Sequence, residues 1–224
     1  MCRNGLIGAA VVLLVVAACG EPGPPPQSPR TSTVTANTLV NPARINMVRR
    51  ELPPDYEVTD IGGPASAAAF WGFGPGWTTE PPQCAALAGP ATDEATTKGW
   101  SASGPGGIVH AAVTGSPASP VTLDPALLGD CGQWAVTSGN TTGTISLIDA
   151  PAVDGATTVG MATQAKTVVE GGTETASAAY TFSAYFDDHL ALVTVVTDPG
   201  SPNPPLGREF AADLLVKTVS ALPG

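Results

Sequence analysis

The chain has 224 residues, a formal net charge of −10, and 43 % hydrophobic against 12 % charged residues. This hydrophobic content indicates a folded chain rather than a disordered one. The acidic balance argues against nucleic acid as a partner, since nucleic acid selects surfaces rich in Lys and Arg. It also argues against electrostatic docking on anionic lipid.

The first 18 residues have the pattern of a bacterial lipoprotein signal peptide. Arg3 supplies a positive n-region, residues 6–16 form an apolar run, and small residues precede Cys19. The pattern resembles the lipobox, in which the cysteine is diacylated and becomes the new N-terminus after cleavage. An uncleaved membrane anchor is the alternative, but the run is shorter than the roughly 20 apolar residues that a span needs. We expect removal of residues 1–18 and lipidation of Cys19.

Residues 19–40 predict a tether, because they are rich in Pro, Thr and Ser and have little to bury. A Pro-rich segment is semi-extended at ~3.1 Å per residue, which would hold a domain up to roughly 60 Å from the bilayer. The protein would then stand on the outer face of the cytoplasmic membrane. The folded domain is expected over residues 41–224.

A helix is predicted to begin this domain. Asn41 and Pro42 are typical of an N-cap and a first helical residue. Apolar residues follow at helical spacing, namely Ile45, Val48 and Leu52. A strand is expected over residues 56–61, and a short helix carrying Cys84 over residues 82–88.

From residue 100 onward the pattern turns to β. Segments rich in β-branched residues alternate with Gly, Asn or Asp turns, which predicts antiparallel hairpins. The expected strands are 100–103, 108–113, 134–137, 144–148, 159–169, 180–186 and 190–197. An amphipathic helix is predicted over residues 210–222. We therefore expect a single α+β domain, with an antiparallel, meander-rich sheet covered by N- and C-terminal helices.

The four cysteines have different expected fates. Cys2 leaves with the signal peptide and Cys19 takes the lipid, so Cys84 and Cys131 remain. An even pair in an exported chain predicts one disulfide. Metal ligation is the alternative, but neither a CxxC motif nor a nearby His accompanies the pair. We expect neither a metal nor a cofactor.

Catalytic motifs are almost missing from the sequence. His110 and His189 belong to no HExxH motif or spaced cluster, and no GxSxG elbow is present. Residues 187–189 (Asp-Asp-His) are interpreted as a hairpin tip with solvated charges, because adjacent side chains point in different directions. His110, among apolar residues of a strand, is interpreted as structural. We expect a protein that is not an enzyme.

Residues 70–77 hold four of the chain's twelve aromatic residues, and glycines between the rings let the backbone bend. The stretch is either a loop that fills the core or a partly exposed platform for a ligand. We expect Phe70 and Phe73 to point inward and at least one of Trp71 and Trp77 to be partly exposed beside a groove. The candidate ligand-binding residues are Trp71, Phe73 and Trp77.

Several segments together resemble an uncharacterised family of mycobacterial lipoproteins, known only as a domain of unknown function. They are the lipobox, the tether, LPPDYEV (52–58), WGFGPGW (71–77), PPQCAAL (81–87) and TVVEGG (167–172). More distantly, Cys84, Cys131 near Trp134 and the closing helix resemble the extracellular sensor domain of mycobacterial serine/threonine kinases. That resemblance implies an α+β, disulfide-bonded, grooved fold that binds a ligand. The sensor domain carries two disulfides, whereas this chain has the cysteines for one.

The leading hypothesis is a non-enzymatic binding or sensor-like domain of the cell envelope, held to the membrane through acylated Cys19. Its ligand would be a lipid, a glycan or a protein. Two alternatives remain open. One is an envelope hydrolase or transferase whose site is assembled from distant residues, and the other is a structural component of an envelope complex.

Overall fold

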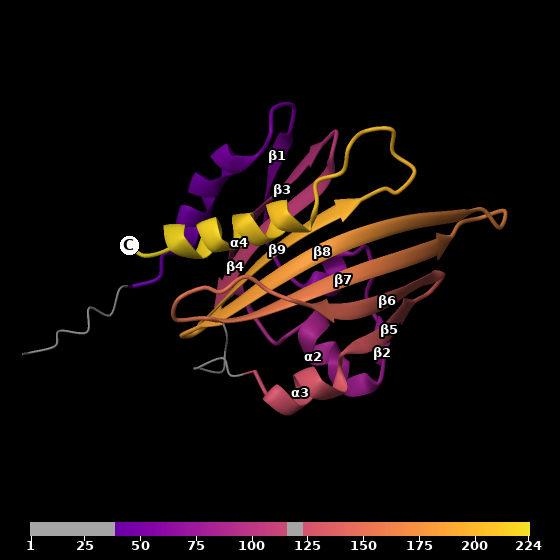
Figure 1. Ribbon diagram of the computed structural model, residues 1–224, viewed down its shortest axis with the longest axis horizontal. Coiled ribbons are helices and arrows are strands. Elements are labelled where there is room, and N and C mark those ends of the chain that lie inside the picture. The colour runs from indigo at the N-terminus through magenta and orange to yellow at the C-terminus, as the bar shows by residue number, and fades with distance from the viewer. Residues whose placement is uncertain (1–38, 116–122) are drawn as a thin grey trace, which may run out of the picture. The chain divides into compact units, whose positions relative to one another are not determined.

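The computed structural model describes residues 39–115 and 123–224 (Figure 1). The predicted signal peptide (1–18), the predicted lipidation site Cys19 and nearly all of the predicted tether lie outside the described residues. Within those ranges no helix has both the length and the apolar character needed to cross a membrane.

The fold is built on one nine-stranded antiparallel sheet with the strand order β1-β3-β4-β9-β8-β7-β6-β5-β2. The strands are β1 (Glu57–Ile61), β2 (Thr78–Glu80), β3 (Asp93–Gly104), β4 (Gly107–Gly115), β5 (Gln133–Ser138), β6 (Thr141–Ile148), β7 (Thr157–Val168), β8 (Glu174–Phe186) and β9 (His189–Thr197). The helices are η1 (Pro42–Glu51), α1 (Ala67–Phe70), η2 (Pro82–Cys84), α2 (Ala85–Ala88), α3 (Pro125–Asp130) and α4 (Arg208–Ala221).

Strands β5 to β9 form a continuous meander, and β4 joins it beside β9. This confirms the expected antiparallel, meander-rich sheet in a single domain. The short elements β2, α1 and α3 were not predicted, because each has six residues or fewer and too few positions to show a period.

The first helix begins as predicted, with the Asn41 side chain accepting a hydrogen bond from the backbone N–H of Ala43 (3.1 Å). It is a 3₁₀ helix, however, rather than the α-helix that the sequence suggested. The reason lies in its two buried side chains, Ile45 and Val48, which are three residues apart. A 3₁₀ helix places residues at that spacing directly above one another, so both reach the sheet.

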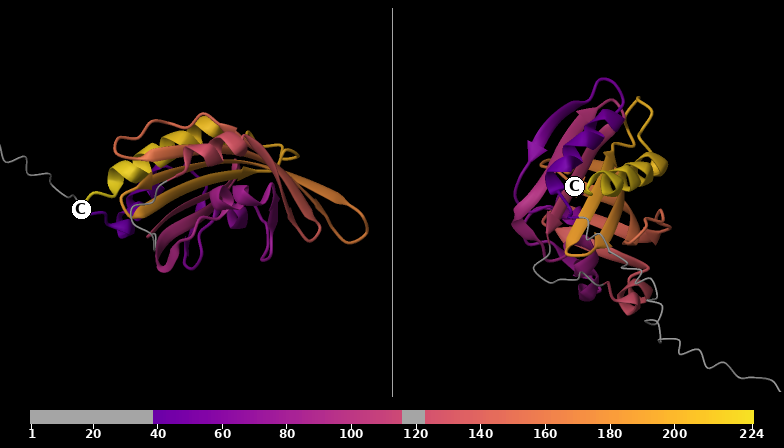
Figure 2. Two further views of the ribbon diagram at one scale, coloured as in Figure 1. Left: turned by 90° about the horizontal axis from the view of Figure 1, so that it is seen from below. Right: turned by 90° about the vertical axis from the view of Figure 1, so that its left-hand side faces the viewer.

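Two hydrophobic clusters lie on opposite faces of the sheet. On the helix face, η1 packs against β3 and β4, and α4 packs against β8 and β9. On the other face, called the disulfide face, the segment from α1 to α2 and the end of α3 pack against the sheet. The left view of Figure 2 shows α4, in yellow, and the purple α1–α2 segment on opposite sides of the strands.

The helix face is only partly covered. The hairpin of β7 and β8 runs past the end of β9, and with β5 and β6 it forms an arm beyond α4 (Figure 1). The expectation that the terminal helices cover the sheet is therefore not confirmed: η1 and α4 pack against β3, β4, β8 and β9, and the arm lies beyond them.

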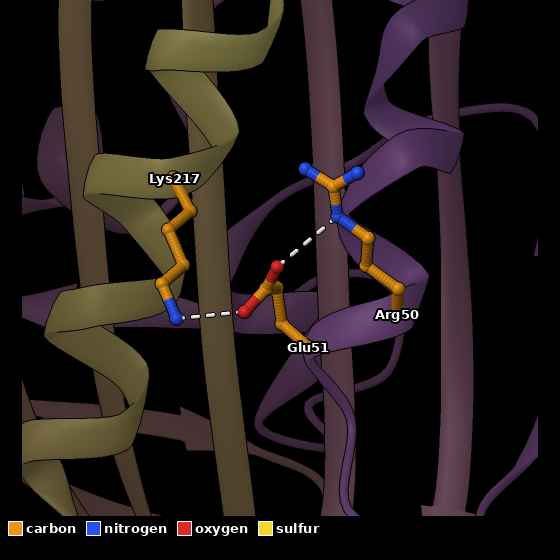
Figure 3. Close-up of polar contacts among 3 residues, drawn as sticks. All are labelled: Arg50, Glu51 and Lys217. Atoms are coloured by element: carbon orange, nitrogen blue, oxygen red, sulfur yellow. Dashed lines mark hydrogen bonds and ion pairs between the residues drawn. The ribbon is translucent and has the colours of Figure 1, made fainter.

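An ion-pair cluster joins the two terminal helices on the helix face (Figure 3). The Glu51 carboxylate accepts hydrogen bonds from Lys217 Nζ of α4 at 2.7 Å and from Arg50 Nε at 3.2 Å. The bond from Lys217 is the main reason that the pKa of Glu51 is lowered from its ordinary value. The cluster is exposed, so it fixes the helices' orientation more than it stabilises them.

The predicted disulfide is confirmed on the opposite face. Cys84, at the end of η2, is bonded to Cys131, which follows α3, and their Cα atoms are 5.7 Å apart. Both cysteines are fully buried. The bridge ties two short helical segments to one another, neither of which is long enough to be stable alone.

Candidate functional site

The open part of the helix face is made of outward positions on the four strands of the arm, β5 to β8. In β8, residues 176, 178 and 180 share a face with Phe182, which packs under α4. Through the strand pairing, the same face of the sheet extends across β7, β6 and β5. We call the outward side chains on these strands the open half: Ala135, Thr137, Thr142, Thr144, Gln164, Lys166, Ala176 and Ala178.

A groove of about 790 Å³ runs over the open half and ends against Pro199. A second hollow of about 410 Å³ shares Ala178 and Pro199 with it and reaches the start of α4. Tyr180, Asn203, Arg208 and Glu209 are among the residues of this end pocket. The two hollows adjoin at Ala178 and Pro199, and each has a volume in the range that is usual for ligand sites.

The wall between α4 and the groove is the loop of residues 198–207, which carries four prolines. Its turns are closed locally, since Asp198 Oδ1 accepts from the N–H of Gly200 (2.7 Å) and Ser201 Oγ accepts from the N–H of Asn203 (3.2 Å). The backbone N–H of Leu206 donates to the carbonyl of Gly106 at 2.9 Å, which fastens the loop to the β3–β4 hairpin. Prolines and local bonds restrict the loop to few conformations.

The groove has almost no charge. Lys166 is its only charged residue, and the Lys166 ammonium is paired with Glu174 at 2.7 Å. The one branched aliphatic residue at the groove, Val136, is fully buried. The surface offered to a ligand is therefore made of threonine hydroxyls and methyls, alanine methyls and the Gln164 amide.

The aromatic stretch lies beneath this groove rather than inside it. Trp71 and Phe73 are each 4 % exposed, and their rings meet edge to face at 6.4 Å. Trp71 Nε1 donates to the hydroxyl of Thr181 at 2.9 Å on the disulfide face. Phe73 packs against Gly143 in the groove floor, where an added Cβ would come within 2.7 Å of the ring. The interpretation as a loop that fills the core describes these two rings.

The other two rings of the stretch are half-buried. Phe70 stacks on His110 with ring centroids 4.5 Å apart and planes 3° from parallel. Trp77 lies against Gly89, whose missing side chain makes room for the ring. Phe73 points inward as expected and Trp77 keeps partial exposure, whereas Phe70 is less buried than expected. None of the four rings lines the groove or the end pocket. Ligand binding by Trp71, Phe73 and Trp77 stays a prediction, and Trp77 alone retains the exposed surface for it.

His110 has the surroundings of a structural residue. Burial lowers its pKa to about 4, so the ring is neutral at pH 7. Its Nδ1 is buried and has no hydrogen-bond partner among the described residues. The ring faces Phe70, and its neighbour across the strands is Thr194, whose hydroxyl lies 2.9 Å from that of Thr181.

The other candidate residues lie apart from the groove. Asp187 and Asp188 form the exposed turn between β8 and β9, as interpreted from the sequence, and the Asp188 carboxylate lies 2.5 Å from His189 Nδ1. Among the described residues, no group of three or more His, Cys, Asp or Glu side chains is placed to hold a metal ion.

Sequence reasoning missed the residues of the groove. The sequence did show polar residues at every second position of these strands, for example Thr142 and Thr144 in β6 and Gln164 and Lys166 in β7. Nothing in the sequence showed that these positions pair into one surface, or that α4 leaves that surface open.

The structure defines a class of protein: a disulfide-bonded domain on one antiparallel sheet, with a few helices and a groove beside α4 that has a single charged residue. The chain belongs to the DUF5642 family, described as a domain of unknown function, whose model matches residues 41–223. This confirms the resemblance to a family known only as a domain of unknown function.

Two solved structures are similar. An uncharacterised protein from Mycobacterium smegmatis, the Rv0999 ortholog, matches with a TM-score of 0.60 and 19 % identity over 83 % of this chain and 98 % of that chain. The extracellular domain of PknH from Mycobacterium tuberculosis matches with a TM-score of 0.46 and 15 % identity over 83 % of this chain and 94 % of that chain. The first match shows that the two proteins share a fold. No curated protein sequence matches the chain.

Proposed function

We propose that this protein is an exported, lipid-anchored and non-enzymatic binding domain of the cell envelope, whose ligand occupies the groove over the open half. The lipobox pattern ending at Cys19 supports the anchor. The Pro-rich tether supports presentation of the domain away from the bilayer.

One observation supports the binding role: the groove is concave and has almost no charged side chains. Solvated faces of antiparallel sheets normally carry charged side chains, and soluble proteins place most of their charge on such surfaces. This chain has 28 charged residues, counting 9 basic and 19 acidic, yet the groove contains only Lys166. Depletion of charge is typical of surfaces that become covered when a partner binds.

The binding role is tested by filling the groove. Ala178 lies where the groove and the end pocket meet, so an Ala178→Trp variant places a large ring in that space. Ala126 is exposed on α3 and lines neither hollow, which makes Ala126→Trp the matched control. Native mass spectrometry of the full chain, extracted from its own membrane, should show a retained ligand in the wild type and the control. Loss of that ligand only in Ala178→Trp is the expected result. Equal retention in both variants would place the binding site elsewhere.

The anchor has an independent test. Cys19→Ala removes the thiol that would be acylated, so processing should stop and the full-length precursor should accumulate. The measurement is the intact mass of the membrane-extracted protein. An unchanged mature mass in this variant would disprove lipidation at Cys19 while leaving the groove's role untouched.

A further inference from the structure

We infer that the ligand of the groove is a neutral oligosaccharide. This inference rests on the proposed binding function and specifies the chemistry of its ligand. It follows from what the groove can recognise and from what its surface excludes.

Charged ligands are disfavoured by the groove's electrostatics. A phosphate or carboxylate ligand needs a free cation, and Lys166 is already bonded to Glu174. Arg208, in the end pocket, donates one N–H to the backbone carbonyl of Asp149 at 3.2 Å, and the carboxylates of Asp198 and Glu209 in the same pocket offset its positive charge. A cationic ligand would need unopposed carboxylates, but the groove residues include neither Asp nor Glu, and the two carboxylates of the end pocket, Asp198 and Glu209, share it with Arg208.

Apolar ligands are disfavoured by the groove's side chains. A lipid chain gains affinity by covering large aliphatic or aromatic surface. The outward residues here are alanines, threonines, one glutamine and Lys166, while Val136 faces the core. The same argument disfavours a protein partner held by large anchors, which usually insert into apolar pockets.

A site for a sugar chain needs neutral hydrogen-bonding groups and an aromatic ring, and this site has both. The side-chain amides of Gln164 and Asn203 make no hydrogen bond to any described residue, so both are available to hydroxyl groups. The half-buried Tyr180 lies in the end pocket, on the same strand face as Ala176 and Ala178, and offers a ring on which the apolar side of a sugar can pack. The threonine and alanine methyls form a shallow floor under the rest of the sugar chain.

The rigidity of the wall also suits such a ligand. Each contact to a flexible, strongly hydrated chain is weak, so affinity depends on a site that loses little entropy on binding. The 198–207 loop is closed by its own hydrogen bonds, and Phe73 supports the floor from below through Gly143. Both arrangements hold the groove in shape before a ligand arrives.

The test uses the full chain on a printed panel of neutral, acidic and sulfated oligosaccharides, followed by titration calorimetry with the best binder. We expect binding to neutral members, with an affinity that hardly changes between low and high salt. Gln164→Ala removes one hydrogen bond, so the affinity should fall about three- to tenfold. Its control is Gln133→Ala, since Gln133 is exposed on β5, donates its amide to Ser146 Oγ at 3.3 Å and lines neither hollow, so its loss should leave affinity unchanged. Tyr180→Phe keeps the ring and should bind within about twofold of wild type, whereas Tyr180→Ala should weaken binding about tenfold.

The outcomes separate this inference from the proposed function. Preferential binding of acidic or sulfated glycans, or steep salt dependence, would overturn it. So would equal effects of the Gln164 and Gln133 variants. A lipid or peptide mass that is retained by the wild type and lost in Ala178→Trp would overturn the sugar ligand and leave the binding role standing. A chain that retains nothing and binds no glycan would overturn both.

Discussion

One strand face passes through two different environments. Within β8, Phe182 is fully buried and Ala184 lies beside it under α4, whereas Ala176, only six residues from Phe182, is exposed in the groove. The residue types follow the environments, since the covered positions are aromatic or aliphatic and the open ones are small or polar. Strand pairing alone therefore does not determine burial; the covering helix does.

Helix length accounts for the boundary between the two regions. The 14 residues of α4 make a helix about 21 Å long, while the 13 residues of β8 extend about 44 Å. A helix of this length cannot cover strands of that length. The part of the sheet left over is the open half.

The largest expected difference between the two regions is in stability. Phe182→Ala in the covered half should lower the free energy of unfolding by about 3–5 kcal/mol, because it leaves a cavity under α4. Gln164→Ala in the open half should stay within about 0.5 kcal/mol of wild type. Urea unfolding followed by circular dichroism measures both. A comparable loss in Gln164→Ala would show that the open half is packed against something.

The second prediction concerns the disulfide, which lies on the opposite face of the sheet from the groove. Replacing both Cys84 and Cys131 by Ser opens the loop between them, which spans 47 positions, and should cost at most roughly 4 kcal/mol. The thermal unfolding midpoint should fall in the double variant and in wild type treated with reductant. Glycan or ligand binding in the folded state should survive, since the groove lies on the other face. An unchanged midpoint under reducing conditions would contradict the structural role of the bridge.

A smaller effect is expected from His110 as the pH falls. Burial holds its folded pKa at about 4, below the ordinary value of 6.5, so the unfolded chain takes up a proton first. The unfolded state therefore gains stability as the pH drops from 6.5 toward 4, and folding weakens by about 2 kcal/mol between pH 7 and pH 5. His110→Phe should remove this part of the acid sensitivity. Urea unfolding of both proteins at the two pH values gives the comparison, and identical pH dependence would contradict it.

The smallest effect is expected at the exposed cluster that joins the terminal helices. Lys217 lowers the pKa of Glu51, so the pair favours folding above the ordinary carboxyl pKa, and this contribution is lost as the pH falls through the lowered value. Lys217→Met should produce a slight drop in the melting temperature at pH 7 that disappears in high salt. A large drop that persists in salt would show that Lys217 contributes through packing instead.

Much of the fold was predictable because its elements are long and strongly patterned. The hairpin turns, the closing helix and the disulfide between Cys84 and Cys131 all appear where the sequence indicated. The elements that were missed, such as β2 and α1, depend on tertiary contacts. In α1, the Ser66 side chain caps a single turn that is long enough only to place Trp71 over Thr181.

The sequence left two interpretations of the aromatic stretch, residues 70–77, open. Composition permitted either a core loop or an exposed platform, because glycines allow the chain to bend in either direction. The structure decided for the core at Trp71 and Phe73, because Thr181 supplies a buried acceptor for the indole N–H and Gly143 leaves room for the phenyl ring. Both partners are more than 65 residues away in sequence.

By itself the sequence determined the local features of this protein: the lipobox pattern, the Pro-rich composition of residues 19–40, the alternation of the strands and the pair of cysteines available for a bridge. Each depends on residues close together in the chain. Tertiary structure alone decided which polar strand faces meet in one surface, which of them α4 covers, and that Phe73 lies beneath Gly143 in the groove floor. These depend on strand order and helix length acting together, and no local pattern contains that information.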